Sequence, residues 1–219
     1  MKHQYRRTGM RQKLVAELRN KGIRDERVLT AIMNVPRHKF LDPAFADWAY
    51  KDVAFPIDAD QTISQPYTVA LQTSLLELSG GETVLEIGTG SGYQACVLAE
   101  MGVKLYTIER QEVLFRKTDM LLQDLGYGRI RTLFGDGYKG SPRFAPFDKI
   151  IVTAGATSIP TALCHQLRVG GQMVIPVEIE PGHQRMFRIT RLTEERYQKE
   201  DFGDCAFVPF LSGVNKKVH

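Results

Sequence analysis

Residues 84–93 read V-L-E-I-G-T-G-S-G-Y and join an apolar strand, a glycine-rich turn and the start of a helix without a break. Gly88 and Gly90 let the backbone bend sharply and approach a ligand with no Cβ in the way, and Gly92 opens the helix that follows. Exposed amide groups at such a turn, together with the helix dipole, favour a polar or negatively charged ligand. The stretch therefore predicts a nucleotide pocket at the end of a buried strand.

The glycine spacing narrows the kind of nucleotide. A dinucleotide-binding fingerprint would read G-x-G-x-x-G, with an acidic residue about 20 positions further on. Here the third glycine falls one place early, and Tyr93 fills the position where that fingerprint has glycine. The spacing G-x-G-x-G, preceded by Glu86, resembles the first motif of S-adenosylmethionine-dependent methyltransferases. The alternative is a plain glycine-rich turn between a strand and a helix.

Acidic residues follow the next two predicted strands. The strand at 104–108 ends in Glu109, where a carboxylate can accept hydrogen bonds from both hydroxyls of a ribose. Asp136 stands between Gly135 and Gly137 directly after the third strand, and it could accept the exocyclic amine of adenine. An Asp-Gly turn without a ligand is the alternative at this position. The two acids and the turn together favour an adenosine-type ligand.

Strands and helices alternate from residue 83 onward, which is the signature of a parallel, doubly wound sheet. We predict strands at 84–87, 104–108, 130–134, 148–152 and 172–176, and helices at 91–101, 111–125 and from residue 160. Ser158 is expected to cap the last helix, and Gly170-Gly171 to close it. Short strands at 186–192, 196–201 and 206–209 are expected to form an antiparallel edge.

The predicted fold class is therefore α/β: a Rossmann-like, doubly wound methyltransferase fold with a mostly parallel sheet of the seven-stranded type. Its 219 residues fit a single domain. We expect N-terminal helices, the second capped by Asp25, and a covering loop within 1–66, with Pro66 opening the next helix. The nucleotide-binding core follows over 67–180, the C-terminal strands over 181–212 and a tail over 213–219, with residues 215–219 expected to be disordered.

Composition argues against several other classes of protein. No stretch approaches the roughly 18 apolar residues of a membrane span, and no basic, apolar leader pattern opens the chain. The three cysteines are far apart and suit a reducing compartment, so we expect a cytoplasmic protein. Histidine and cysteine do not cluster, which predicts no metal. Residues 2–27 carry nine Lys or Arg against three Asp or Glu, but Tyr5 is the single aromatic residue among them that could stack on a base, so no nucleic acid is expected.

Further motifs appear in order along residues 10–212. They are V-P-R-H-K-F at 35–40, Q-T-I-S-Q-P at 61–66, the glycine turn, G-D-G at 135–137, F-D-K-I-I-V-T-A at 147–154, and Q-L through G-G to P-V over 166–177. In this set the chain resembles the protein-L-isoaspartate (D-aspartate) O-methyltransferase family, and the Thr-Ile-Ser-x-Pro element is the specific part of the likeness. The strand at 148–152 leads into T-A-G, without the motifs of enzymes that methylate nucleic-acid amino groups or cytosine carbon.

The resemblance implies transfer of a methyl group from S-adenosylmethionine to the free α-carboxyl of L-isoaspartyl residues, with S-adenosylhomocysteine as product. The partners would be damaged proteins and peptides. The methyl ester then cyclises to a succinimide, which reopens partly to normal aspartate. A carboxylate acceptor is already ionised at pH 7, so this reaction needs no general base, and the sequence shows none.

The resemblance also assigns candidate site residues. Ser64 matches the family's active-site serine and would orient the acceptor carboxylate; a helix N-cap before Pro66 is the alternative. Ile63, Phe207, Val208 and Pro209 would bind the peptide, the last three along its extended backbone, although a plain edge strand stopped by proline is equally consistent. The expected cofactor-binding residues are Thr62, Glu86, Gly88, Thr89, Gly90, Ser91, Gly92, Glu109, Arg110, Asp136 and Gly137.

The chain departs from the family pattern at two places, and two alternative functions remain. The loop before Thr62 reads I-D-A-D at 57–60 where the family commonly has glycine, and Glu178 stands where glycine usually follows Pro-Val. Peptide preference is therefore not fixed by the resemblance. The chain could methylate a different carboxylate or a small molecule, or it could be a cofactor-binding module that docks to proteins or RNA through its basic N-terminal helices.

Overall fold

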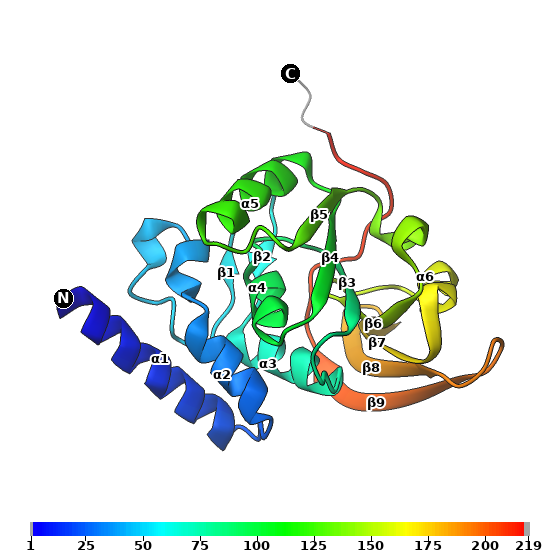
Figure 1. Ribbon diagram of the computed structural model, residues 1–219, viewed down its shortest axis with the longest axis horizontal. Helices are drawn as coiled ribbons and strands as arrows, with labels where there is room; N and C mark the ends of the chain where they lie inside the picture. The colour runs from blue at the N-terminus through cyan, green and yellow to red at the C-terminus, as the bar shows by residue number, and fades with distance from the viewer. Residues whose placement is uncertain (1, 217–219) are drawn as a thin grey trace.

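A seven-stranded sheet forms the centre of the computed structural model, which describes residues 2–216 (Figure 1). Its strand order is β5-β4-β3-β6-β7-β8-β9. The strands are β3 (Thr83–Ile87), β4 (Lys104–Glu109), β5 (Arg131–Phe134), β6 (Phe147–Val152), β7 (Leu167–Glu180), β8 (His183–Arg191) and β9 (Tyr197–Cys205). Strands β3 to β7 are parallel, while β8 runs antiparallel to β7 and β9 antiparallel to β8. The predicted mixed sheet is confirmed.

The position of β3 creates the place for a ligand. This strand pairs with β4 on one side and with β6 on the other. The order of winding therefore reverses at β3, and in open α/β sheets a crevice opens at the carboxyl end of such a strand. The glycine-rich turn follows directly after Ile87, the last residue of β3.

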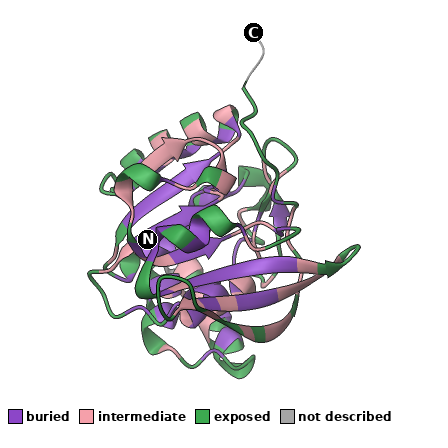
Figure 2. Ribbon diagram, turned by 90° about the vertical axis from the view of Figure 1, so that its right-hand side faces the viewer, coloured by how far each residue is buried: buried purple, intermediate pink, exposed green. Residues whose placement is uncertain are grey.

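Helices cover both faces of the sheet. They are α1 (Lys2–Asn20), α2 (Glu26–Asn34), α3 (Pro66–Leu75), α4 (Tyr93–Glu100), α5 (Glu112–Asp124) and α6 (Thr161–Gln166), with short 3-10 turns η1 (Arg37–Phe40), η2 (Pro43–Phe45), η3 (Gly137–Lys139) and η4 (Pro142–Phe144). Buried side chains of α1 to α4 form one core with residues such as Ile151, and α6 packs on the other side with residues such as Ile150. Figure 2 shows the central strands as buried ribbons.

A short hairpin covers the end of the sheet nearest the glycine turn. Strands β1 (Phe55–Pro56) and β2 (Thr62–Ile63) pair antiparallel, within the region expected to be a covering loop. Ala59 and Asp60 at its tip both have positive φ, of 57° and 55°, which L-residues rarely adopt. Asp58 forms an exposed ion pair of 2.7 Å with Lys117 on α5, so this departure from the family pattern links the hairpin tip to the surface of that helix.

The basic residues of the first two helices are largely engaged within the fold. Arg11 donates to the carbonyl of Met33, and Arg27 donates to the carbonyl of Leu78. Arg19 pairs with Glu26. These contacts favour the interpretation of the N-terminal charge as a structural and solvated helix face. Within residues 2–216, no helix is both long and apolar enough to cross a membrane.

The structure corrects the predicted boundaries around β7. Helix α6 ends at Gln166 and β7 begins at the next residue, so Gly170 and Gly171 lie inside a strand and do not close the helix. A Cβ at Gly171 would meet three backbone oxygens at 2.9–3.2 Å, those of Phe147 and Asp148 on β6 and of Arg168 on β7, which is why glycine is needed there. Ser158 does not cap α6, because Pro160 occupies the N-cap position.

Two predictions near the C-terminus are also corrected. Residues 206–209 form no strand; Pro209 makes only an isolated bridge to Gly155. Asn215, expected in a disordered tail, is fixed to the start of α5, because its side-chain amide donates to Gln111 and its carbonyl accepts from the Glu112 amide. The rest of the predicted tail, residues 217–219, lies outside the described part of the chain.

Candidate active site

A cleft with a volume of about 770 Å³, including its open mouth, lies at the carboxyl end of β3. It is lined mainly by the β2 region at 61–64, the glycine turn at 87–91, the ends of β4 and β6, and the segment at 208–211, with further residues from α3, α4 and η3. The predicted residues that line it are Thr62, Ile63, Ser64, Gly88, Thr89, Gly90, Ser91, Glu109, Arg110, Gly137, Val208 and Pro209. The sheet topology thus brings most of the predicted site residues into one cleft.

The glycine turn depends on a threonine that the sequence analysis did not single out. Gly88 has φ of 94°, and a Cβ there would collide with the Oγ1 of Thr153. That hydroxyl donates to the carbonyls of Ile87 and Gly88 at 2.9 and 2.8 Å. Thr153 belongs to the V-T-A motif at the end of β6, so the motif was a signal for it, but its contact with the turn exists only through the pairing of β3 and β6.

Glu109 closes the far side of the turn. Its Oε2 accepts from the Gly90 amide at 2.9 Å and its Oε1 from the Gln111 amide at 2.8 Å. The side chain is 4% exposed and lines the cleft. Each carboxylate oxygen retains a second lone pair for a ligand hydroxyl.

Glu86, expected to bind the cofactor, does not line the cleft. It is fully buried in β3, where Oε2 accepts from Thr107 at 2.6 Å and Oε1 has no partner among the described residues. The Thr107 hydroxyl in turn bonds the Thr89 hydroxyl at 2.7 Å, and Thr89 lines the cleft. Burial raises the pKa of Glu86 to about 8, and the nearby charge of Glu109 adds to this. A chain of hydrogen bonds through Thr107 and Thr89 therefore connects Glu86 to the cleft.

Asp136 and Gly92 also lie outside the lining. Both carboxylate oxygens of Asp136 accept from backbone amides, Oδ1 from Tyr138 at 3.0 Å and Oδ2 from Gly213 at 2.9 Å. This carboxylate therefore fixes the C-terminal segment beside the cleft. Gly92 instead allows α5 to approach the turn, since a Cβ there would meet Thr118 at 2.7 Å.

Ser64 lies in the cleft with an available hydroxyl. The N-cap position of α3 belongs to Gln65, so the interpretation of Ser64 as a helix cap is wrong. Its hydroxyl has no hydrogen-bond partner among the residues that the structure describes, whereas its carbonyl accepts from Arg37 at 2.9 Å. A hydroxyl that is free within the protein can donate to a bound group.

Arg37 holds the segment that carries Ser64, and the sequence analysis assigned it no role. The guanidinium is fully buried and donates to the carbonyls of Ala49, Val53 and Ser64 at 2.9, 3.2 and 2.9 Å. It also lies over the ring of Tyr93, 5.4 Å from the centroid. Its place in the V-P-R-H-K-F motif was the only signal in the sequence.

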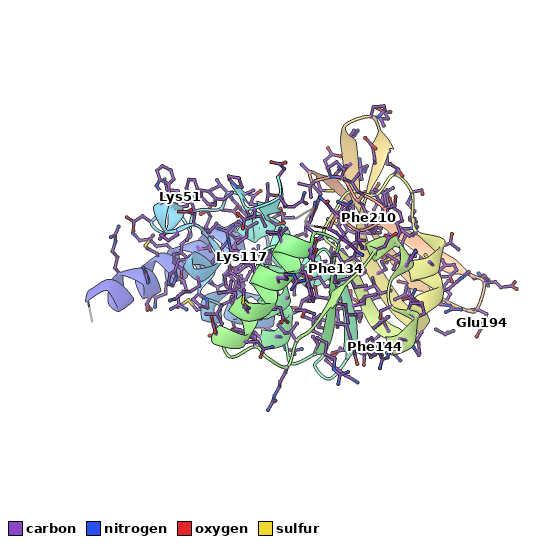
Figure 3. All side chains as sticks on the ribbon, turned by 90° about the horizontal axis from the view of Figure 1, so that it is seen from above. Lys51, Lys117, Phe134, Phe144, Glu194 and Phe210 are labelled. Atoms are coloured by element: carbon purple, nitrogen blue, oxygen red, sulfur yellow. The ribbon has the colours of Figure 1, made fainter. Side chains whose placement is uncertain are left out.

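The segment after β9 crosses the mouth of the cleft, and Figure 1 shows it rising from β9 past the sheet towards the C-terminus. The Gly155 amide donates to Val208 O, and the Phe210 amide donates to Gly155 O, both at 2.8 Å. Phe210, labelled in Figure 3, stacks on Tyr138 with ring centroids 3.9 Å apart. Phe207 does not line the cleft, because its side chain packs against the core.

The cleft can position a charged acceptor but offers little acid–base chemistry. Among the described residues that line it, none is histidine, cysteine or lysine. Its ionisable groups are Glu109, which two amides already bind, Arg110 and the buried Tyr93. Within residues 2–216, no group of three or more His, Cys, Asp or Glu could hold a metal ion.

Comparisons with known proteins agree on one family. The sequence pattern of the family "Protein-L-isoaspartate(D-aspartate) O-methyltransferase" matches residues 9–215. The protein-L-isoaspartate O-methyltransferase of Christiangramia forsetii is 55% identical over 98% of this chain and 100% of its own length. The protein of the same name in Cytophaga hutchinsonii is 53% identical over 100% of this chain and 99% of its own.

Solved structures agree as well. A protein-L-isoaspartate O-methyltransferase superposes with a TM-score of 0.83 at 26% identity, covering 93% of this chain and 67% of that one. A second protein of this description, from Plasmodium falciparum and in complex with S-adenosyl-L-homocysteine, gives a TM-score of 0.79 at 25% identity over 91% of this chain and 97% of its own. With its fold, its cleft and its relatives in agreement over nearly the whole sequence, this chain belongs to the protein-L-isoaspartate (D-aspartate) O-methyltransferase family.

Proposed function

We propose that this protein transfers a methyl group from S-adenosylmethionine to the free α-carboxyl of L-isoaspartyl residues in damaged proteins and peptides, and so begins their conversion to aspartate. The observation that carries the proposal is the placement of Ser64 and the glycine turn in one cleft. A free hydroxyl donor faces the same space as a backbone turn built for a nucleoside. Membership of the family supports the same activity.

The residues present fit S-adenosylmethionine. At Gly90 a Cβ would meet only Ile57, at 3.9 Å, so the backbone of the turn is open to a ligand. Glu109 offers carboxylate lone pairs for ribose hydroxyls beside this turn. We propose that the turn, Glu109, Arg110 and Thr62 hold the cofactor, and that Glu86 and Asp136 act behind them. When bound, S-adenosylmethionine supplies the methyl group.

The protein's own contribution is to position the acceptor and exclude water. Ser64 donates its hydroxyl proton to the acceptor carboxylate and orients it without removing its charge. Ile63, Val208 and Phe210 form apolar walls around it, and dehydration strengthens the carboxylate as a nucleophile. No general base is required, because the attacking oxygen is already ionised near pH 7.

The substrate is recognised by its backbone along residues 207–209, which allows many sequences to bind. The two departures from the family pattern do not disturb this edge: Asp58 is paired with Lys117, and Glu178 accepts from the Gly182 amide at 2.8 Å within its own hairpin. We also propose that the protein acts in the cytoplasm and without nucleic acid, membrane or metal. The three cysteines are free, which is compatible with a reducing compartment.

The test is methyl transfer from labelled S-adenosylmethionine to a peptide with one isoaspartyl residue, beside the same peptide with normal aspartate. Transfer to the isoaspartyl peptide alone is expected. Ser64→Ala should lower kcat far more than it weakens cofactor binding, whereas Ser79→Ala, outside the cleft, should change neither. Transfer to neither peptide, with cofactor still bound, would point to a different carboxylate or small-molecule acceptor and contradict the proposal.

A further inference from the structure

The side chain of Gln184 bonds to both backbone groups of a single residue, Phe207. The Phe207 amide donates to Gln184 Oε1 at 2.8 Å, and Gln184 Nε2 donates to the Phe207 carbonyl at 3.1 Å. Strand β9 ends at Cys205, so Phe207 has no neighbouring strand to pair with. A side-chain amide carries the same donor and acceptor as a peptide group. Gln184 therefore replaces a strand partner at the point where the sheet stops.

Gly155 shares this contact. A Cβ at Gly155 would overlap the Gln184 amide, with Cδ at 2.5 Å and Oε1 at 2.8 Å, so the space that a side chain would need is filled by Gln184. The backbone of Gly155 binds the next residues of the segment, donating to Val208 O and accepting from the Phe210 amide. Gln184 and Gly155 thus fix residues 207–210 from the side of the sheet.

The bonds on this side determine which backbone groups remain for a ligand. The amide and carbonyl of Phe207, the carbonyl of Val208 and the amide of Phe210 are all used. The amide of Val208 and the carbonyl of Pro209 have no partner among the described residues, and both residues line the cleft. One donor and one acceptor beside the cleft therefore remain available for a ligand.

We propose that Gln184 is a positioning residue for the substrate: it fixes the 207–209 segment so that the Val208 amide and the Pro209 carbonyl can bind the backbone of the isoaspartyl peptide. The inference rests on the proposed function. Gln184 does not line the cleft, so it acts through Phe207 and not on the reacting groups. Its loss should weaken the peptide's KM while cofactor binding is retained.

The test compares Gln184→Met and Gln184→Glu with the wild-type protein. Methionine keeps the length of the side chain but loses both bonds, so KM for the isoaspartyl peptide should rise about tenfold, the effect of losing one or two ordinary hydrogen bonds. The kcat and the Kd for S-adenosylhomocysteine should stay within about twofold of the wild type, since the substitution touches neither Ser64 nor the glycine turn. Gln198→Met, on the exposed part of β9, is the matched control and should leave KM unchanged.

Gln184→Glu supplies a readout that a merely structural role would not give. The ionised carboxylate can accept from the Phe207 amide but repels the Phe207 carbonyl. The protonated carboxyl has a donor and an acceptor and restores both bonds. Repulsion by the Phe207 carbonyl should raise the pKa of the introduced carboxyl above its ordinary value of about 4.3. The KM of Gln184→Glu, divided by that of the wild type at the same pH, should therefore fall as the pH is lowered from about 8 towards about 5. Gln198→Glu should show no such recovery.

The outcomes separate this inference from the proposed function. Wild-type protein that methylates neither peptide contradicts the proposed function, whatever the variants do. Wild-type protein that methylates the isoaspartyl peptide, with a KM ratio of Gln184→Glu that does not change with pH, overturns the role of Gln184. An unaltered KM in Gln184→Met, or a loss confined to kcat or to cofactor affinity, overturns it as well. If Gln184→Met does not fold, the pH series of Gln184→Glu still decides.

Discussion

Replacement of Arg37 by methionine should remove the hydrogen bond that holds the segment carrying Ser64 in place. Methionine preserves an unbranched apolar stem beside Tyr93 but removes three hydrogen bonds from a buried cation. Loss of the bond to Ala49 O, which is fully buried, should cost about 2 kcal/mol, because that carbonyl is left unsatisfied. The bonds to Val53 and Ser64 are part-buried, and water can replace them in part, so each should cost about 1 kcal/mol.

The expected loss in the free energy of unfolding is therefore about 4 kcal/mol, reduced to about 3 kcal/mol because the variant no longer buries a charge. Release of the Ser64 carbonyl should also lower kcat about tenfold or more, because a small misplacement of an orienting group is costly. Affinity for S-adenosylhomocysteine should change little, since the hydrogen bonds of Arg37 go to Ala49, Val53 and Ser64 and not to the glycine turn or Glu109.

Urea unfolding, steady-state kinetics and calorimetric titration of S-adenosylhomocysteine measure these three quantities. Arg27→Met is the matched control, because Arg27 also donates to two carbonyls, of Leu78 at 2.6 Å and Met101 at 3.2 Å, but lies outside the cleft. It should lose about 1–2 kcal/mol and retain normal turnover. The reasoning would be refuted if Arg37→Met were no less stable than Arg27→Met, or if its kcat were unchanged.

Three further changes test other parts of the site. The pKa of Glu86 is raised from 4.5 to about 8 in the folded protein, so its contribution to stability is complete below about pH 4.5 and is lost as the pH rises through 8. Glu86→Gln should remove this decline when Tm is measured against pH. Parallel curves for the variant and the wild type would contradict the burial argument. Gly88→Ala should abolish cofactor binding, because the new Cβ would collide with Thr153. Gly102→Ala is the control: it has a similar backbone penalty at φ of 79° but no neighbour within 4 Å, and it should bind the cofactor normally. Equal cofactor affinities of the two variants in titration would disprove the role of the collision. Ala59→Gly should raise the free energy of unfolding by about 0.5–1 kcal/mol, since glycine relieves the strain of a left-handed residue at φ of 57°. Ala46→Gly, at φ of −58°, should lower it. A destabilised Ala59→Gly in urea unfolding would show that the turn is not strained.

Local patterns in the sequence predicted much of the fold. Hydrophobic runs placed β3, β4 and β6 to within a residue or two. The cap at Asp25 and the helix start at Pro66 were also correct, because strand periodicity and helix start signals depend on neighbouring residues. The pair Gly170-Gly171 failed as a helix stop. Gly171 is required by its close approach to the backbone of the neighbouring strand β6, which local sequence cannot reveal.

Some residues of the candidate site could be predicted from local sequence, and others could not. The motifs alone were enough to pick out the glycine turn, Glu109 and Ser64, which line one cleft, because glycine conformation and strand-end position are local properties. The bonds of Glu86 to Thr107, of Arg37 to the Ser64 carbonyl and of Gln184 to Phe207 emerged only from the folded chain. These contacts join residues far apart in the chain, and each is set by strand pairing and burial, which no single stretch of sequence encodes.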